Sequence, residues 1–439
     1  MSVHNAAVDP TRTVSDLANE KIYRKVVFRI IPFFAFCYLA AYLDRINIGL
    51  AKLQMEDDLG FSGTVYGLGA GLFFVAYIIF EVPSNLILQR VGARIWIARI
   101  MITWGILSGL TMFVTSPMQF YVLRFLLGVA EAGFVPGVLL YLTYWFPSRR
   151  RAKIIGMFMV GLPAAAMIAG PLSGWIMTAM NGTAGLRGWQ WLFLIEAIPS
   201  VALGVLAIFL LPNSIAKARW LNAAEKAGLQ AAIDEDIRSA PHQEHRLSAA
   251  LKSSRVWLLG TIDMSFMMAT YAIAFWLPTL LRDAGATSTY QIGWLTAIPH
   301  ALAIVVMLLN GYSSDRTRER RWHLVIPLLI GAAGMFLSIF VTNNLWLTLL
   351  FFTIANVGIV ATYPVFWCLP GTFLTGKAAA AGIALIASIA NFGGFMATYV
   401  LGWLKDLTHS PNAGMILFAF FLVFGSYLVL TLPARVVNR

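Results

Sequence analysis

The sequence is poor in charge. Of its 439 residues only 12% are Asp, Glu, Lys or Arg, whereas 59% are hydrophobic, and the mean hydropathy is +0.75. A soluble domain carries about a quarter charged residues, so this chain has too little polar surface to coat a water-soluble globule. Disorder is excluded as well, because disordered chains lack the Phe, Leu, Ile and Trp that abound here.

Residues for metal or covalent chemistry are also scarce. The two cysteines, Cys37 and Cys368, lie in apolar stretches, which excludes a disulfide scaffold and a Cys-rich metal site. His242 and His245 are three residues apart, but the sequence offers no third ligand beside them. We therefore expect no metal and no cofactor. With no nucleophile or acid–base cluster, a membrane-embedded enzyme is disfavoured.

Nucleotide-binding signals are incomplete. The run Gly371-x4-Gly376-Lys377 has Ala378 where Ser or Thr should hold magnesium, and no strand precedes it. ATP is therefore not expected as a partner, and any pumping must draw on an ion gradient. The remaining glycine patterns predict close helix packing. They are the run 67–71 and the pairs Gly105/Gly109, Gly133/Gly137 and Gly170/Gly174.

Long apolar stretches are what the sequence does contain. A spanning helix needs about 20 mostly apolar residues. The stretches that qualify are 26–50, 63–88, 94–115, 118–145, 154–180, 189–212, 255–281, 289–312, 322–342, 345–371, 378–403 and 413–433. A transmembrane barrel is excluded, because its strands would alternate apolar and polar residues. The sequence predicts an all-α membrane protein with twelve transmembrane helices.

Basic residues fall mainly on one side of these spans. With connections numbered alternately, 26 of the 32 Lys and Arg residues share the side of the N-terminus. The opposite side holds Lys52, Arg187, Arg282 and Lys405, and Arg45 and Arg124 lie inside spans. The positive-inside rule then places both termini in the cytoplasm. Topology accounts for the net charge of +12 without a nucleic-acid partner.

The longest polar segment divides the spans six and six. The expected organisation is a cytoplasmic tail (1–25), an N-terminal half (26–212), a cytoplasmic linker (213–254), a C-terminal half (255–433) and a second tail (434–439). The sequences of the two halves resemble each other weakly. Each has a basic turn after its second span, and Gly-Trp ends its fifth. Repeated six-span halves around a central cavity are typical of secondary transporters.

Several motifs strengthen this interpretation. Gly311 to Arg321 reads G-x-x-x-D-R-x-x-x-R-R and resembles the cytoplasmic loop motif of the major facilitator superfamily. The stretches 43–49, 80–85, 124–133 and 191–196 resemble signatures of its anion:cation symporter branch. That branch carries organic anions such as tartrate, phthalate, hexuronates and hydroxyphenylacetate, usually with protons, and its members usually work as monomers. One departure is Gln89, where the general loop motif has Asp.

Ionisable residues inside spans are expensive and are functional candidates by default. Arg45 and Arg124 each lie seven residues from the outer end of a span, which is about 10 Å at 1.5 Å per residue. Two guanidinium groups at one level could hold a carboxylate. The alternative is that each Arg pairs permanently with a neighbouring acid.

Proton coupling needs an acid that can change its charge. Glu131 lies near the midplane, on the same helix face as Arg124, so an arriving anion would compete for that guanidinium. Asp44, next to Arg45, is a second candidate. A fixed ion pair remains open for each acid, and the role of Asp263 is left open.

Further residues complete the predicted site and gates. We expect substrate contacts from Tyr42, Tyr77, Tyr271, Trp276, Tyr363, Trp367 and Asn391, although aromatics in spans are often packing or interfacial residues. Gating is expected of Glu81, Arg90, Arg94, Asp315, Arg316, Arg320 and Arg321. Glu196 is expected to tie helix ends together.

The sequence favours a proton-coupled symporter that imports a small organic anion. Gly170-Pro171 resembles a motif of antiporters in the superfamily, so exchange of organic anions remains an alternative. A sensor that does not transport is disfavoured, because such proteins usually carry long cytosolic extensions. We expect the chain in a bacterial inner membrane.

Overall fold

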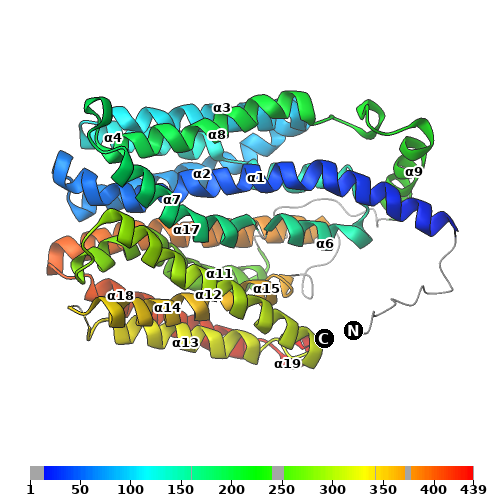
Figure 1. Ribbon diagram of the computed structural model, residues 1–439. Coiled ribbons are helices and arrows are strands. Elements are labelled where there is room, and N and C mark those ends of the chain that lie inside the picture. Colours follow the sequence, from blue (N-terminus) through cyan, green and yellow to red (C-terminus); the bar gives the residue numbers. More distant parts are fainter. Residues whose placement is uncertain (1–13, 160, 240–251, 342, 371–376, 439) are drawn as a thin grey trace, which may run out of the picture.

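The computed structural model describes residues 14–159, 161–239, 252–341, 343–370 and 377–438. Over these ranges the chain is helical and has no strand. Figure 1 shows the long helices side by side, with the first half of the chain above the second. The start of α1 (Val14–Leu59), the linker helix α9 (Ala223–Ser239) and the last helix α19 (Ala434–Val437) lie at one end of the bundle, here called the terminal end. The opposite end is called the far end.

The first half runs from α1 to α8. After α1 come α2 (Gly63–Val91), α3 (Ala93–Leu110), α4 (Pro117–Glu131), α5 (Phe134–Thr143), α6 (Ser148–Met159), α7 (Gly161–Ala179) and α8 (Gly188–Leu210), with short 3-10 turns at Thr111–Phe113 and Thr183–Gly185. The predicted tail 1–25 is helical from Val14 onward, because α1 continues past the apolar stretch.

The second half runs from α11 to α19. Its helices are α11 (Ser254–Asp283), α12 (Thr289–Thr317), α13 (Trp322–Ser338), α14 (Leu345–Ala361), α15 (Tyr363–Phe366), α17 (Lys377–Thr408), α18 (Asn412–Thr431) and α19. In the described residues, ten helical stretches are long and apolar enough to cross a membrane. Two shorter apolar helices, Ala164–Ala179 and Trp322–Ser338, lie in two further predicted stretches.

The predicted stretch 118–145 is not one continuous helix. It breaks between α4 and α5 at Gly133, whose φ of 86° is left-handed. A side chain there would also overlap Ser84 of α2, so only glycine suits both the backbone and the neighbour. The break puts Glu131 at the end of α4, in the middle of the bundle.

The two halves meet along paired helices. α2 packs along α17, α7 along α12, and α1 along α11. Glycines allow these contacts, because a Cβ on Gly67 would overlap the Thr398 carbonyl oxygen, and one on Gly170 would overlap that of Gly293. The predicted close packing at these two glycines is confirmed.

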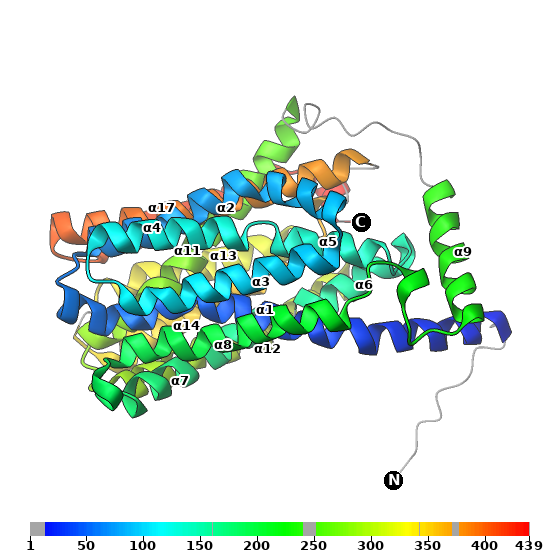
Figure 2. The ribbon, with the colours of Figure 1, turned by 90° about the horizontal axis from the view of Figure 1, so that it is seen from above.

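The described part of the linker joins the first half. Lys25 of α1 binds Glu225 of α9 at 2.9 Å, and the Trp145 and Trp220 rings stack with centroids 5.7 Å apart. Figure 2 shows α9 beside the start of α1. His242, His245 and the glycine-rich run 371–376 lie outside the described residues.

The α7–α12 contact can be tested with two glycine substitutions. Gly293→Ala should lower the melting temperature of the detergent-purified protein, because overpacking costs about 1–3 kcal/mol. Gly228→Ala on α9 is the matched control, since no atom lies within 4 Å of its Cβ position. It should be neutral or slightly stabilising, by up to about 1 kcal/mol. Equal melting temperatures for both variants would contradict the close approach.

Candidate functional site

Two arginines meet at one aromatic ring in the first half. The Cζ atoms of Arg45 on α1 and Arg124 on α4 lie 5.1 and 5.3 Å from the centroid of Phe73 on α2. Both arginines are buried, with 8% and 1% of their surface exposed. The predicted shared level of the two guanidinium groups is therefore observed in the structure, and Phe73 places them close together.

Glu131 pairs with Arg45 rather than with Arg124. A carboxylate oxygen of Glu131 forms an ion pair with Nη2 of Arg45. The direct partner of Glu131 is thus not the predicted Arg124, because α4 ends at Glu131 and its side chain reaches α1, and the compensation of Glu131 by Arg124 stays a prediction. Arg124 forms no ion pair with a described residue, which leaves one buried positive charge without an acidic partner.

Several buried donors of the two arginines are unused. Nε of Arg45, and Nε and Nη2 of Arg124, have no hydrogen-bond acceptor among the described residues. A buried donor without an acceptor costs about 1–3 kcal/mol, and more when the group is charged. Such groups are rare in native proteins and call for an absent water, ion or ligand. An anion is the group that satisfies both the unused donors and the unbalanced charge.

Tyrosines from both halves lie around this pair. The Tyr77 ring centroid is 5.3 Å from the Arg45 Cζ, and Tyr271 of α11 lies within electrostatic range of Arg45. Tyr363 lies in the second half, and its hydroxyl is 2.6 Å from Oγ1 of Thr270. Tyr42 is buried against α7, in an apolar cluster with Ala165 and Ala169. The structure brings Tyr77 and Tyr271 to the arginines, and Tyr42, although it packs in this cluster, also lies within electrostatic range of Arg45.

For three other predicted substrate contacts, no interaction with the two arginines is found among the described residues. Trp276 is at the far end, where its ring contacts Lys52, and Trp367 has 40% of its surface exposed. Their roles as substrate contacts stay predictions, because sequence spacing gave the helix but not the depth or the face. Asn391 on α17 is half-buried and makes no hydrogen bond to another described residue.

Asp44 is held inside the first half. It accepts hydrogen bonds from Trp104 Nε1 at 2.9 Å, Ser108 Oγ at 2.9 Å and Ser200 Oγ at 2.6 Å. These donors come from α3 and α8, on the side of α1 away from α11. The geometry makes Asp44 an anchor of α1, and its role in proton coupling stays a prediction.

Two further buried acids bridge helices. Ser173 of α7 donates to Glu196 of α8 at 2.7 Å, as expected for a helix tie. Ser388 of α17 donates to Glu81 of α2 at 3.5 Å, and this contact crosses between the halves. The predicted gating role of Glu81 remains a prediction that this contact supports.

The far end is closed by a network that the sequence did not reveal. The Lys52 side chain is fully buried, with Nζ 3.4 Å from the Trp276 ring centroid and 3.2 Å from Glu56. Glu56 also binds Arg282 of α11 at 2.9 Å. Lys52 and Arg282 were placed at span ends from their position alone, and only the fold brings them together.

A second cross-half contact lies beside this network. The Asp406 carboxylate of α17 accepts hydrogen bonds from the N–H groups of Gly63 and Thr64 at 3.0 and 2.7 Å. These N–H groups lie at the start of α2, where a helix leaves donors free and favours negative charge. The contacts at the far end therefore hold α1, α2, α11 and α17 together.

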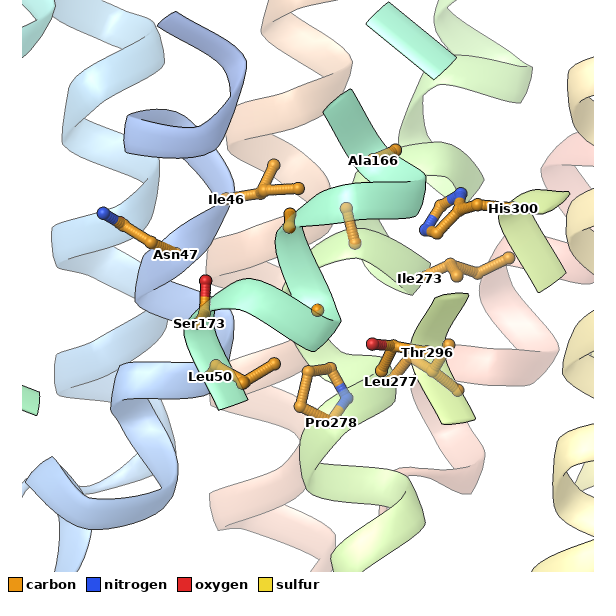
Figure 3. A pocket seen from close by; sticks show the side chains of 13 residues that line it. Ile46, Asn47, Leu50, Ala166, Ser173, Ile273, Leu277, Pro278, Thr296 and His300 are labelled. Atoms are coloured by element: carbon orange, nitrogen blue, oxygen red, sulfur yellow. The ribbon is translucent and has the colours of Figure 1, made fainter. Parts of the chain in front are cut away.

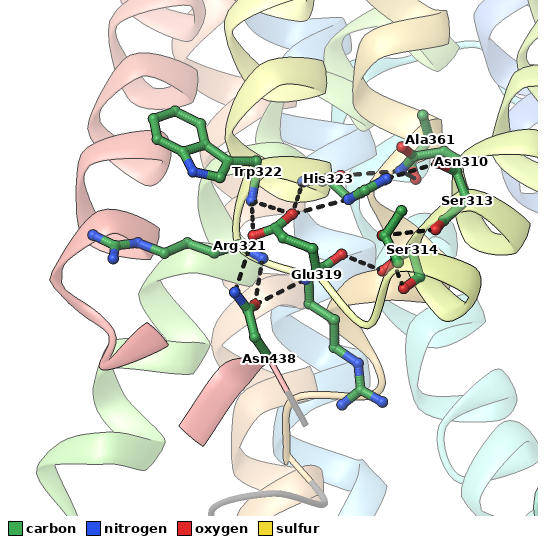
Figure 4. A network of polar contacts seen from close by, with 11 residues as sticks. Asn310, Ser313, Ser314, Glu319, Arg321, Trp322, His323, Ala361 and Asn438 are labelled. Atoms are coloured by element: carbon green, nitrogen blue, oxygen red, sulfur yellow. Dashed lines mark hydrogen bonds and ion pairs between the residues drawn. The ribbon is translucent and has the colours of Figure 1, made fainter. Parts of the chain in front are cut away.

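At the terminal end, the predicted gating loop binds the chain's own C-terminal segment. Asn438 Oδ1 accepts from the N–H groups of Arg320 and Arg321 at 2.9 and 3.2 Å, and Nδ2 donates to Glu319 at 3.2 Å. Arg321 Nη2 also donates to the Leu430 carbonyl. Figure 4 shows this network between α12, α13 and the segment after α19. Burial raises the pKa of Glu319, but the hydrogen bonds that it accepts outweigh this effect and hold that pKa below its ordinary value.

The other predicted gate residues are not part of this network. Asp315, Arg316 and Arg90 are exposed, and their side chains form no hydrogen bond or ion pair with another described residue. The backbone N–H of Arg94 donates to Asn213 at 3.1 Å, within the first half and linker. An ion-pair gate formed by Asp315 is thus not observed in this conformation.

A small cavity lies between α1, α7, α11 and α12. Asn47, Ser173, Thr296 and His300 contribute its polar lining (Figure 3). Its volume of about 30 Å³ holds about one water. An organic anion does not fit there, so the arginine pair remains the candidate site.

Comparison with known proteins agrees with the fold and the motifs. The sequence model of the Major Facilitator Superfamily matches residues 34–398 of this chain. A Pseudomonas putida protein named "Putative metabolite transport protein NicT" is 55% identical over 424 residues, which are 97% of each chain. An Agrobacterium vitis protein named "Putative tartrate transporter" is 46% identical, over 94% of this chain and 91% of that one.

A solved structure shares the architecture. It is a bacterial homologue of the human lysosomal transporter Spinster in an inward-facing and occupied conformation. It superposes with a TM-score of 0.74 at 15% identity, over 93% of this chain and 96% of that one. At this identity the match concerns the fold alone. Together these matches confirm the resemblance indicated by the sequence motifs.

The far-end network predicts a shift in conformation when its buried cation is removed. Lys52→Met keeps the aliphatic side chain but removes the ammonium group from the Trp276 ring and Glu56. A desolvated cation–π contact is worth about 2 kcal/mol, so the closed far end should lose at least about tenfold in population. Spin labels on Asp57→Cys and Thr408→Cys, in a Cys37→Ala/Cys368→Ala background, should report longer distances. Lys217→Met is the exposed control, and an unchanged distance distribution in Lys52→Met would refute the seal.

Proposed function

This chain belongs to the Major Facilitator Superfamily, and from that premise we propose that it imports a small organic anion together with protons. It is a multi-pass membrane protein and a secondary transporter, and members of this superfamily are transporters rather than enzymes. Beyond this family assignment, we propose the class of substrate, the coupling ion and the direction of transport.

One observation carries the assignment to an anion. Arg124 is buried, has no acidic partner among the described residues, and leaves Nε and Nη2 without acceptors. A carboxylate between Arg124 and Arg45 would take up these donors in the paired geometry that guanidinium groups favour. Tyr77 and Tyr271 would then contact the rest of the molecule.

The proposed coupling to protons rests on Arg45, because both the Glu131 carboxylate and the substrate carboxylate would bind it. In this structure it is engaged by Glu131. If a substrate carboxylate draws on Arg45, Glu131 loses part of its compensation, and a carboxyl group at this depth then favours its neutral form. Protonation of Glu131 in turn frees Arg45 for substrate. Anion and proton would therefore bind and leave together.

The transport cycle needs two ends that open in turn. We assign the terminal end to the cytoplasm, since basic residues gather on that side of the sequence. All twelve apolar stretches then cross the membrane, in two halves of six that rock about the arginine pair. The network of Lys52, Glu56 and Arg282 is the outer gate and is closed here. A bacterial inner membrane is the expected location.

The choice of anion can be settled by binding. The relatives named for tartrate and for a metabolite support a small organic acid. A thermal-shift screen of mono- and dicarboxylates on purified protein should single out the substrate, since a ligand stabilises the state that binds it by mass action. Uptake into proteoliposomes that respond to an imposed pH gradient would support symport, whereas a strict need for anion inside would indicate exchange.

The carboxylate site predicts that Lys cannot replace either arginine. Arg45→Lys and Arg124→Lys keep a positive charge but lose the planar pair of donors. A hydrogen bond to a charged group contributes about 1.5–3 kcal/mol, so anion affinity and uptake should fall by about 10- to 100-fold. Arg187→Lys, whose side chain is 64% exposed at the far end, is the control and should transport normally. Normal uptake by both core variants would exclude the site.

The coupling role of Glu131 predicts binding without accumulation. Glu131→Gln mimics the protonated acid and frees Arg45, so it should bind the anion at least as tightly as the wild type. It should not accumulate the anion when an inward proton gradient is imposed on proteoliposomes. Glu196→Gln removes a buried carboxyl of the same half and should still accumulate substrate. Retained proton-driven accumulation in Glu131→Gln would reject the assignment.

A further inference from the structure

The second half contains one buried acid that nothing in the site explains. Asp263 on α11 has no exposed surface, and neither carboxylate oxygen has a hydrogen-bond partner among the described residues. The buried acids of the first half differ in this respect. Asp44, Glu81, Glu131 and Glu196 each accept at least one side-chain hydrogen bond.

Among the described residues, no Lys or Arg forms an ion pair or hydrogen bond with Asp263. In the described residues from 254 to 438, every Lys and Arg lies in a loop or within the first or last four residues of a helix. His300, within α12, is instead 3.2 Å from Asn356 of α14. An ionised carboxylate buried without a partner costs several kcal/mol, so Asp263 is neutral in this conformation.

Asp263 lies on the face of α11 that leads toward the arginine pair. Nine residues separate it from Ser254, the start of α11, which is about 14 Å along the axis. Thr270, seven residues further on, shares its face and contacts Tyr363 of α15. Tyr271 lies within electrostatic range of both Asp263 and Arg45. The titratable groups toward Asp263 are therefore Tyr271 and Tyr363.

A neutral carboxyl group in this position is still unsatisfied, because its O–H has no acceptor. A buried polar group that is unsatisfied in both protonation states is expected to meet water in another conformation. When the bundle opens at one end, water at Asp263 would solvate its carboxylate and allow the proton to leave. Closure would require the proton to return.

We propose that Asp263 is a second proton-binding site, in the half opposite to Glu131, and that its proton crosses the membrane with the substrate. This inference rests on the proposed function for its coupling to an anion. The proton binds a carboxylate oxygen from water on one side and leaves to water on the other. With Glu131 also protonated, two protons then accompany each anion. The net charge moved per anion is therefore more positive by one than it would be if Glu131 alone carried a proton.

The protonation of Asp263 can be measured without transport. Infrared difference spectra of purified wild type and Asp263→Asn at neutral pH should show the carbonyl band of a protonated carboxylic acid that is lost in the variant. Asp263→Asn resembles the neutral acid and should keep the melting temperature of the wild type. A spectrum in which the variant loses only ionised carboxylate bands would overturn the proposal, even if the chain proved to be an exchanger.

The transport of that proton is tested by stoichiometry. Reversal potentials in proteoliposomes should give about two protons per anion for the wild type and about one for Asp263→Asn. Uptake by the variant should remain driven by the pH gradient, with one charge fewer per anion. Glu235→Gln, which removes an exposed carboxyl on α9, should match the wild type. A protonated Asp263 with unchanged stoichiometry would also overturn the proposal, whereas loss of proton-driven uptake in wild type would overturn the proposed function instead.

Discussion

The organisation of this bundle depends on one unbalanced buried charge. The Cζ atoms of Arg45 and Arg124 lie 5.1 and 5.3 Å from the Phe73 ring centroid, but Glu131 forms its ion pair with Arg45. In a low-dielectric interior a guanidinium without an acceptor is costly, and the fold tolerates that cost where a ligand repays it. In the proposed function, the site would therefore select for negative charge before any detail of substrate shape enters. It would also tie proton binding to anion binding, because Glu131 and the proposed substrate anion would use the same arginine.

The surrounding structure fixes this arrangement. Three hydrogen bonds to Asp44 anchor α1 against α3 and α8, which sets the direction of Arg45. The break at Gly133 ends α4 at Glu131 and allows its carboxylate to reach α1. Broken helices at the midplane are a recurring way for transporters to place binding groups. The first half therefore positions the two arginines, and the second half contacts it through Tyr271 and the far-end network.

The sequence predicted the fold better than the partners of each side chain. Apolar length and basic asymmetry identify the spans, because both reflect the membrane and need no knowledge of packing. Helix rise also placed Arg45 and Arg124 at one level. It could not show that Glu131 turns to Arg45, since the break at Gly133 is invisible in an apolar run that membrane helices tolerate. Lys52 was placed only at the end of the first span, because its burial arises when Trp276 from the other half covers it.

Proton uptake on binding tests the central claim most directly. The anion that stabilises the purified protein best would be titrated calorimetrically in two buffers of different ionisation enthalpy. At a pH where Glu131 is ionised, competition for Arg45 predicts that about one proton is taken up for each anion bound. Asp263 should add nothing, since it is already neutral in this conformation. Anion binding without proton uptake at any pH would contradict the account, because Glu131 and the substrate would then not share Arg45.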